Sequence, residues 1–279
     1  MKLVKSVLVT MLLGIMAIQM AQANSNEELF RHIRNGNLTG VKYSILKGGA
    51  DINARNDRGK TALYEAINTR HGEIAEWLIE KGADVNESTP LILMVTRGDI
   101  EGVKYLISKG ADVNIDTPLY YALEYCKELY YSGIGDKVFV ERCGGLVKSL
   151  VENGADVNVK TNGITLLEKA IHLEIVKILV EKGADINVKD KYGDTLLMKF
   201  LDPDIIKYLI EKGLDVNAKN KDGQTPLMYA VASGSQLVAE YLVAKGADIN
   251  AKDKAGNTAL NYARSSRMET FLMNLELGE

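Results

Sequence analysis

The sequence predicts an all-α solenoid of about eight stacked helix-turn-helix units with short β-turn fingers. Two recurring blocks, and the helical spacing of the apolar residues between them, predict this fold. A Gly-x-Asp block and a Thr-x-Leu block alternate with a period of about 33 residues, which is typical of repeat architectures. The first block begins at Gly49, Gly82, Gly110, Gly154, Gly183, Gly213 and Gly246. The second begins at Thr61, Thr89, Thr117, Thr165, Thr195, Thr225 and Thr258.

The unit that starts at Thr225 illustrates how the residues specify two helices. The Thr225 hydroxyl is suited to cap the first helix, and Pro226 fits its first turn, where no backbone N–H needs a partner. Gly234 ends that helix, apolar residues recur at helical spacing in the second, and Gly246 supplies a left-handed C-cap. A lone helix pair cannot bury its apolar faces, so neighbouring units must stack.

The N-terminal segment differs from the repeats. Lys2 and Lys5 precede an uncharged, largely apolar stretch that ends in Ala21-Gln22-Ala23, with small residues where a signal peptidase reads. We therefore expect a signal peptide over residues 1–23, cleaved after Ala23, and a single repeat domain over residues 24–279. The mature protein would be exported, either to the periplasm or as a secreted protein. The alternative is an uncleaved anchor, but the dense apolar part of about 12 to 15 residues is shorter than the roughly 20 that span a bilayer.

The repeated blocks resemble the ankyrin repeat over essentially the whole chain from about Asn26 to Leu275. The resemblance is carried by the Gly-x-Asp blocks, by Thr-Pro-Leu motifs, and by alanines three residues after several of their leucines. These prolines are Pro90, Pro118 and Pro226, and the alanines are Ala66, Ala122, Ala170, Ala230 and Ala263. The histidine that this family usually places after Thr-Pro-Leu is absent.

The resemblance, taken with the signal peptide, implies an exported ankyrin repeat protein of bacterial type. We expect an N-terminal cap at 26–48 and a C-terminal cap at 258–279. The family implies a non-enzymatic adaptor that binds a partner protein along the concave surface made by its fingers and first helices. A membrane-tethered periplasmic scaffold and a secreted effector that acts on a host protein stay open as alternatives. The sequence does not name the partner.

Departures from the regular period predict local differences. The step from Gly82 to Thr89 is 7 residues, against 12 from Gly49 to Thr61, so the fingers before Thr89 and Thr117 are five residues short. The unit that starts at Thr117 holds 16 extra residues, which predicts a long-helix or hairpin insertion at about 127–142. The next two units are three residues short at the turn between their helices, and Asp202-Pro203 is expected to start a second helix directly.

The chain contains 2 cysteines, and the insertion separates them. Subtracting the extra residues brings Cys126 next to Cys143, one on each arm of the inserted hairpin. Since an exported protein meets oxidising conditions, we predict a disulfide between them. Two buried free thiols are the alternative.

Other kinds of chemistry find little support. A net charge of -3 is unlike the basic excess of nucleic-acid binders. Gly133-Ile134-Gly135 lacks the third glycine of a dinucleotide loop and is expected at a hairpin tip, and the 3 histidines lie in different repeats. The recurring Asp residues are expected to form turns. We expect no catalytic residue, metal site, cofactor or small-molecule ligand, and a monomer that is not an enzyme.

The candidate partner-binding residues lie at finger tips and first-helix ends. The fingers carry a summed charge of about +5 by sequence count, so an acidic partner would be steered to them, although lysines that only keep turns soluble give the same pattern. Several tyrosines cluster at residues 120–131, where they either bind a partner or form the small core of the insertion. The candidates are Asp57, Arg58, Lys60, Asn68, Thr69, Tyr121, Tyr125, Lys191, Tyr192, Lys221, Asp222, Gln224, Ser233 and Lys254.

Overall fold

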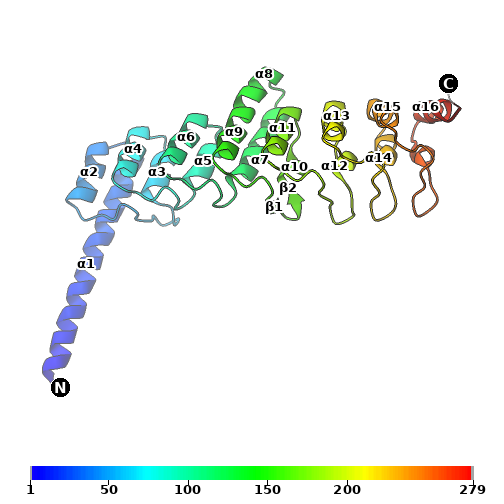
Figure 1. Cartoon of the computed structure of the whole chain (residues 1–279). Helices are drawn as coiled ribbons and strands as arrows, with labels where there is room; N and C mark the ends of the chain where they lie inside the picture. The colour runs from blue at the N-terminus through cyan, green and yellow to red at the C-terminus, as the bar shows by residue number, and fades with distance from the viewer. Residues whose placement is uncertain (1, 278–279) are drawn as a thin grey trace. The chain divides into compact units, whose positions relative to one another are not determined.

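The computed structural model describes residues 2–277, and side chains of residues 11–274. It is all-α and consists of helix pairs that follow one another in sequence (Figure 1). The chain divides into two compact units, Met1–Tyr125 and Cys126–Glu279, which are described separately. The predicted fold class is confirmed.

The first unit contains three helix pairs and the beginning of a further helix. Each first helix contacts the first helix of the next pair, as α1 contacts α3 and α3 contacts α5. The helices are α1 (Lys2–Arg34), α2 (Leu38–Leu46), α3 (Ala62–Asn68), α4 (Gly72–Glu80), α5 (Pro90–Thr96), α6 (Ile100–Ser108) and α7 (Pro118–Tyr131), the last of which runs on into the second unit.

The second unit continues the same arrangement and adds one two-stranded hairpin, β1–β2. Its elements are α8 (Asp136–Phe139), a π-helix η1 (Val140–Gly144), α9 (Gly145–Glu152), β1 (Lys160–Thr161), β2 (Ile164–Thr165), α10 (Leu166–Lys169) and α11 (Leu173–Glu181). They continue with α12 (Leu196–Lys199), α13 (Pro203–Glu211), α14 (Pro226–Ala232), α15 (Gln236–Ala244), a 3₁₀ helix η2 (Ala259–Tyr262) and α16 (Ser266–Leu277).

Threonine side chains cap the first helices α3, α10 and α14, which confirms the cap predicted at Thr225, whereas Thr195 makes no cap hydrogen bond before α12. The hydroxyl of Thr225 accepts a hydrogen bond from the Met228 backbone N–H, and Thr165 forms a capping box with Glu168. Thr89 differs, because its φ of 60° is left-handed and its side chain makes no cap hydrogen bond. Its finger is one of the two truncated ones, so the chain enters α5 by a tighter backbone route.

The aspartates of the Gly-x-Asp blocks form turns, which confirms their predicted role. Each carboxylate accepts a hydrogen bond from the backbone N–H two residues further on, in all seven blocks. The following asparagine often reaches the next repeat. Asn217 Oδ1, for example, accepts from the Asp248 N–H at 2.8 Å, and its Nδ2 donates to the Gly246 carbonyl at 2.9 Å.

The core contains apolar residues of both helices of each pair, and the same positions recur in successive second helices. Ile175 and Leu179 in α11 are buried, as are the matching Ile205 and Leu209 in α13. These side chains are spaced one helical turn apart and face the neighbouring pair, since α11 contacts α13 and α13 contacts α15. Neighbouring repeats therefore bury one another's apolar faces.

The insertion lengthens the helices themselves. α7 continues to Tyr131, the chain turns through residues 132–135, and the return arm runs through α8 and η1 into α9 without a break. Gly133, at the turn, has a φ of +75°, which only glycine adopts without strain. Phe139 is 1% exposed and lies against Tyr130 and His172, so the extension has its own small core.

The prediction that the units of Thr165 and Thr195 are three residues short at the turn between their helices is wrong. The missing residues are lost from the ends of the first helices, since α10 and α12 each have four residues against seven in α14. The predicted start at Asp202 is confirmed, because its carboxylate accepts hydrogen bonds from the Asp204 and Ile205 N–H groups.

The N-terminal segment is helical and continuous with the first repeat. α1 passes through Ala23 without interruption, and its apolar side chains between Met11 and Met20 are exposed. Within the described residues, no helix is both long and apolar enough to cross a membrane. Cleavage after Ala23 stays a prediction.

Candidate protein-binding surface

The full-length fingers share one hairpin geometry. In the finger of Asn56, the side-chain Oδ1 accepts hydrogen bonds from the Arg58 and Lys60 N–H groups, each at 3.0 Å. Gly59 adopts a φ of +71° and donates its N–H back to the Asn56 carbonyl at 2.8 Å. Asp190, Asn220 and Asp253 organise the later fingers in the same way. One asparagine or aspartate thus fixes each tip and leaves its neighbours free to project.

Backbone hydrogen bonds join successive fingers in the second unit. The Lys221 N–H donates to the Tyr192 carbonyl at 3.0 Å, and the Lys254 N–H donates to the Asp222 carbonyl at 2.9 Å. The fingers approach so closely that a Cβ at Gly193 would lie 3.0 Å from the Lys221 nitrogen. Three fingers therefore act as one rigid edge.

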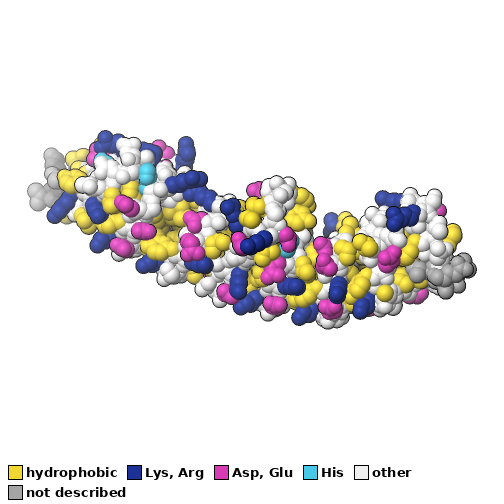
Figure 2. Space-filling view, turned by 90° about the horizontal axis from the view of Figure 1, so that it is seen from above, with side chains coloured by type: hydrophobic (Ala, Val, Ile, Leu, Met, Phe, Trp, Pro, Cys, Tyr) yellow, Lys and Arg dark blue, Asp and Glu magenta, His cyan; other side chains and the backbone are white. Residues whose placement is uncertain are grey.

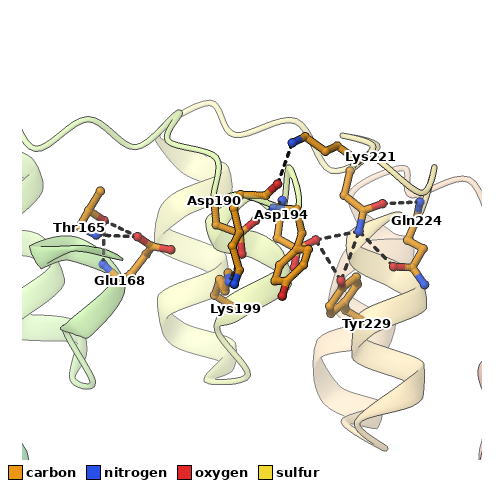
Figure 3. A network of polar contacts seen from close by, with 11 residues as sticks. Thr165, Glu168, Asp190, Asp194, Lys199, Lys221, Gln224 and Tyr229 are labelled. Carbon is orange, nitrogen blue, oxygen red and sulfur yellow. Dashed lines mark hydrogen bonds and ion pairs between the residues drawn. The ribbon is translucent and has the colours of Figure 1, made fainter. Parts of the chain in front are cut away.

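Below these tips lies a polar network centred on Asp194, which is only 8% exposed (Figure 3). Its Oδ1 accepts hydrogen bonds from Asn220 Nδ2 at 2.7 Å and from the Tyr229 hydroxyl at 2.9 Å. Burial and the Asp194 carboxylate raise the pKa of Tyr229 to about 12. The network connects the finger of one repeat to the first helix of the next.

Ion and hydroxyl pairs extend the network at both ends. Lys199 pairs with Asp190; burial alone would raise the Asp190 pKa, but this pair and two backbone N–H groups outweigh it and lower the pKa. At the other end, Gln224 donates to the Tyr262 hydroxyl at 2.8 Å, and that hydroxyl donates to Asp253 at 2.6 Å. The hydrogen bond from Tyr262 is the main cause of a lowered pKa for Asp253.

The predicted residues of the second unit lie on or beside this edge. Lys191, Tyr192, Lys221, Asp222 and Lys254 are exposed. The Lys191 ammonium lies 4.8 Å from the Tyr192 ring centroid, and Lys221 Nζ donates to the Lys191 carbonyl at 2.7 Å. These lysines thus hold defined positions.

Two further candidates of this unit have partners of their own. Gln224 is half-buried in the network, and exposed Ser233 donates its hydroxyl to the Ala230 carbonyl at 2.8 Å.

The predicted residues of the first unit are also accessible. Asp57, Arg58 and Asn68 are exposed. Lys60 lies 4.6 Å from the Tyr64 ring centroid, and Thr69 donates its hydroxyl to the Glu65 carbonyl at 2.8 Å. Arg97 donates to both the backbone and side-chain oxygens of Asn68, which fixes the end of α3.

The tyrosines divide into packing and exposed residues. Tyr125 is half-buried and packs over Gly98, since a Cβ there would lie 2.2 Å from the Tyr125 hydroxyl. Tyr121 is 37% exposed and meets Tyr120 edge-to-face. Tyr131, near the tip of the extended hairpin, is 71% exposed. Tyr125 therefore has a packing role, and Tyr121 is accessible.

The truncated finger before Thr89 is replaced by side-chain contacts that the sequence reasoning missed. Arg55 of the preceding full finger pairs with Glu87, and Ser88 Oγ accepts a hydrogen bond from the Thr61 N–H at 3.3 Å. The Arg55–Glu87 spacing of 32 residues, close to one repeat period, was the available signal.

The two cysteines face each other within the extended hairpin. Cys126 lies on α7 and Cys143 in the π-helix, and both side chains are buried thiols. A hydrogen bond between them is the main cause of a raised pKa for Cys126, and burial adds to it. The structure therefore brings the predicted pair together in the reduced form, and their oxidation stays a prediction.

No group of three or more metal-ligating side chains occurs among the described residues. The histidines make structural contacts: His172, for instance, accepts from the Glu174 N–H at the start of α11 and pairs with Asp136 at 2.9 Å. The surface is therefore an array of fixed tips and helix ends.

Comparison with known proteins is consistent with this architecture. A sequence comparison with curated proteins gave no match. The profile of the family described as Ankyrin repeats (3 copies) matches residues 29–117, 139–190, 173–253 and 196–274. The unmatched stretch between the first two segments contains the extension of α7, and the matched segments cover most of the chain. The chain therefore belongs to the ankyrin repeat family.

Proposed function

We propose that this chain is an exported, non-enzymatic adaptor that binds an acidic partner protein along its fingers and first helices. Ankyrin repeats in general mediate protein–protein interaction. The observation that favours the finger surface is the edge of the second unit, where backbone hydrogen bonds join three fingers and Lys221 Nζ is hydrogen-bonded to the Lys191 carbonyl. Fixed side chains lose little conformational entropy on binding, so such an edge suits recognition.

Charge reversal tests the role of this edge. The mature chain is first used as bait to recover partner proteins from the envelope fraction of its native cells. The association rate of one recovered partner is then measured by surface plasmon resonance. Lys191→Glu, Lys221→Glu and Lys254→Glu together should slow association at least about tenfold at low salt. A matched triple, Lys207→Glu in α13 with Lys212→Glu and Lys245→Glu at the C-caps of α13 and α15, should have a much smaller effect. Equal effects of the two triples would contradict the proposal.

Export is part of this proposal. A charged start, an apolar stretch and the Ala21-Gln22-Ala23 site support it. Mass spectrometry of the purified protein should find Asn24 as the first residue. An intact N-terminus on a membrane-bound protein would favour the tethered scaffold, and recovery from the culture medium would favour the secreted effector.

A further inference from the structure

A groove of 490 Å³ lies between the return arm of the extended hairpin and α11, both in the second unit. One wall is formed by η1 and α9, and includes Val140 and Gly144. The other wall is α11, from which Ile178 and the acidic residues Glu174 and Glu181 line the space. These are second helices, whereas the proposed finger surface lies at the opposite end of the repeats in Figure 1.

Two glycines line this groove. Gly144 and Gly145 have ordinary helical backbone angles, with φ near -60°, so their conformation does not require glycine. A Cβ at Gly144 would meet its nearest neighbours at 3.9 to 4.0 Å, which is normal contact. Alanine would fit and would stabilise the helix by roughly 1 kcal/mol. The glycines therefore leave space at the expense of helix stability.

The matching positions of the next repeats carry side chains. Counted back from the Gly-x-Asp block, Gly144 corresponds to Leu173 in α11 and to Pro203 in α13. The extended arm also contains the π-helix, which shifts the side chains by one residue relative to an α-helix. The two repeats that follow the insertion thus lack this glycine, whereas Gly72 stands at the matching position in α4.

The groove combines an apolar floor with a charged rim of four glutamates and two lysines, Lys148 and Lys182, so the rim is acidic on balance. Glu141 and Glu152 each lie near a lysine of their own helix, at 4.0 and 3.8 Å. Glu174 and Glu181 lie on one face of α11, two turns apart, and form no ion pair among the described side chains. The apolar side chain of Ile178 lies between them.

We propose that this groove binds a basic amphipathic helix of a partner protein. Two helices with facing stripes leave a channel into which the ridge of a third helix fits. Apolar residues of that helix would cover Val140 and Ile178, and its lysines or arginines would pair with Glu174 and Glu181. This site is independent of the finger surface and adds a second point of attachment.

A designed peptide probes the site. A fluorescein-labelled helix of about 15 residues, with leucines along one face and lysines elsewhere, is titrated with the mature protein and followed by anisotropy. Glu174→Lys with Glu181→Lys should weaken binding about tenfold or more. The matched control is Asp204→Lys with Glu211→Lys, the same positions in α13, and should change binding less than about twofold.

Filling the groove provides a second readout that separates folding from binding. Gly144→Leu should weaken peptide binding, while its thermal unfolding shows that the protein is still folded. Gly144→Ala should raise the midpoint of thermal unfolding. Absence of peptide binding to the unaltered protein would overturn the proposal. Two other results would also overturn it: equal weakening of peptide binding by the α11 double variant and by the α13 control, or unchanged peptide binding in Gly144→Leu. In either case, peptide binding would not depend on the groove.

Discussion

At the residue scale, single polar side chains fix the positions of the fingers. Tyr229 is the clearest case, because its hydroxyl donates to buried Asp194 and accepts from Asn220. Tyr229→Phe leaves that carboxylate without one of its donors and should lower the free energy of unfolding by about 1–3 kcal/mol in urea denaturation.

Tyr208→Phe is the matched control for this prediction. Its buried hydroxyl has no hydrogen-bond partner among the described residues, so its loss should be neutral or slightly stabilising. If both variants lose the same stability, the network around Asp194 does not hold the fingers.

The same tyrosine predicts a loss of stability at alkaline pH. The pKa of Tyr229 is raised to about 12 in the folded protein, above the value near 10 of an unfolded chain. Its contribution is therefore complete below about pH 10 and is lost as the pH rises through about 12. The urea midpoint should fall between about pH 10 and 12, and less steeply in Tyr229→Phe. Parallel pH profiles would contradict this assignment.

The cysteine pair gives a further prediction at this scale. Cys126 and Cys143 are buried thiols that interact with each other inside the extended hairpin, so a protein purified from an oxidising compartment should contain a disulfide between them. Thiol titration of the unfolded, unreduced protein should find no free thiol, and reduction should lower stability by roughly 3 kcal/mol. Two reactive thiols in freshly exported protein would show that the pair stays reduced.

Part of this residue-level detail can be predicted from the sequence. The turn role of Asp248 and the cap at Thr225 follow from contacts within a few residues, so the local pattern predicts them. The Asp194–Tyr229 bond joins residues 35 apart, and only the stacking of two repeats brings them together. Nothing in the local sequence of either residue indicates its partner.

At the element scale, asparagines link one repeat to the next. Asn217→Ala removes the two hydrogen bonds to Asp248 and Gly246 and leaves those backbone groups unpaired. We expect a loss of about 1–3 kcal/mol in the free energy of unfolding and faster hydrogen exchange at the Asp248 amide.

Asn250→Ala is the control for that link, since no hydrogen bond of its side chain to another repeat occurs in the described part of the chain. Its effect should stay within about 0.5 kcal/mol. A similar loss in both variants would mean that the turn itself, rather than the link between repeats, determines stability.

Element lengths were predicted less well than element types. The spacing between the repeated blocks shows that three residues are missing from the unit of Thr195. It does not show whether the turn or the first helix is the shorter element. The turn is kept because Asp202 and Pro203 start α13 directly, so α12 ends early. The insertion became longer helices because Phe139 packs against Tyr130, a contact between the two arms that spacing cannot show.

At the scale of the whole molecule, the account depends on neighbouring repeats burying one another's apolar faces. The period of the Gly-x-Asp blocks predicted this stacking, and the buried positions of α11, α13 and α15 agree with it. The groove beside the inserted repeat was not predicted, because it depends on how an extended arm lies against α11.

The most direct test of this claim is the circular dichroism of an isolated repeat. A peptide of residues 224–250 contains α14 and α15 but no neighbour for Val238 or Leu242, both buried in the full chain. The account predicts little helix and no cooperative unfolding for this peptide, whereas the full chain should unfold cooperatively. A stable helical spectrum with a sharp melting transition from the peptide alone would contradict it.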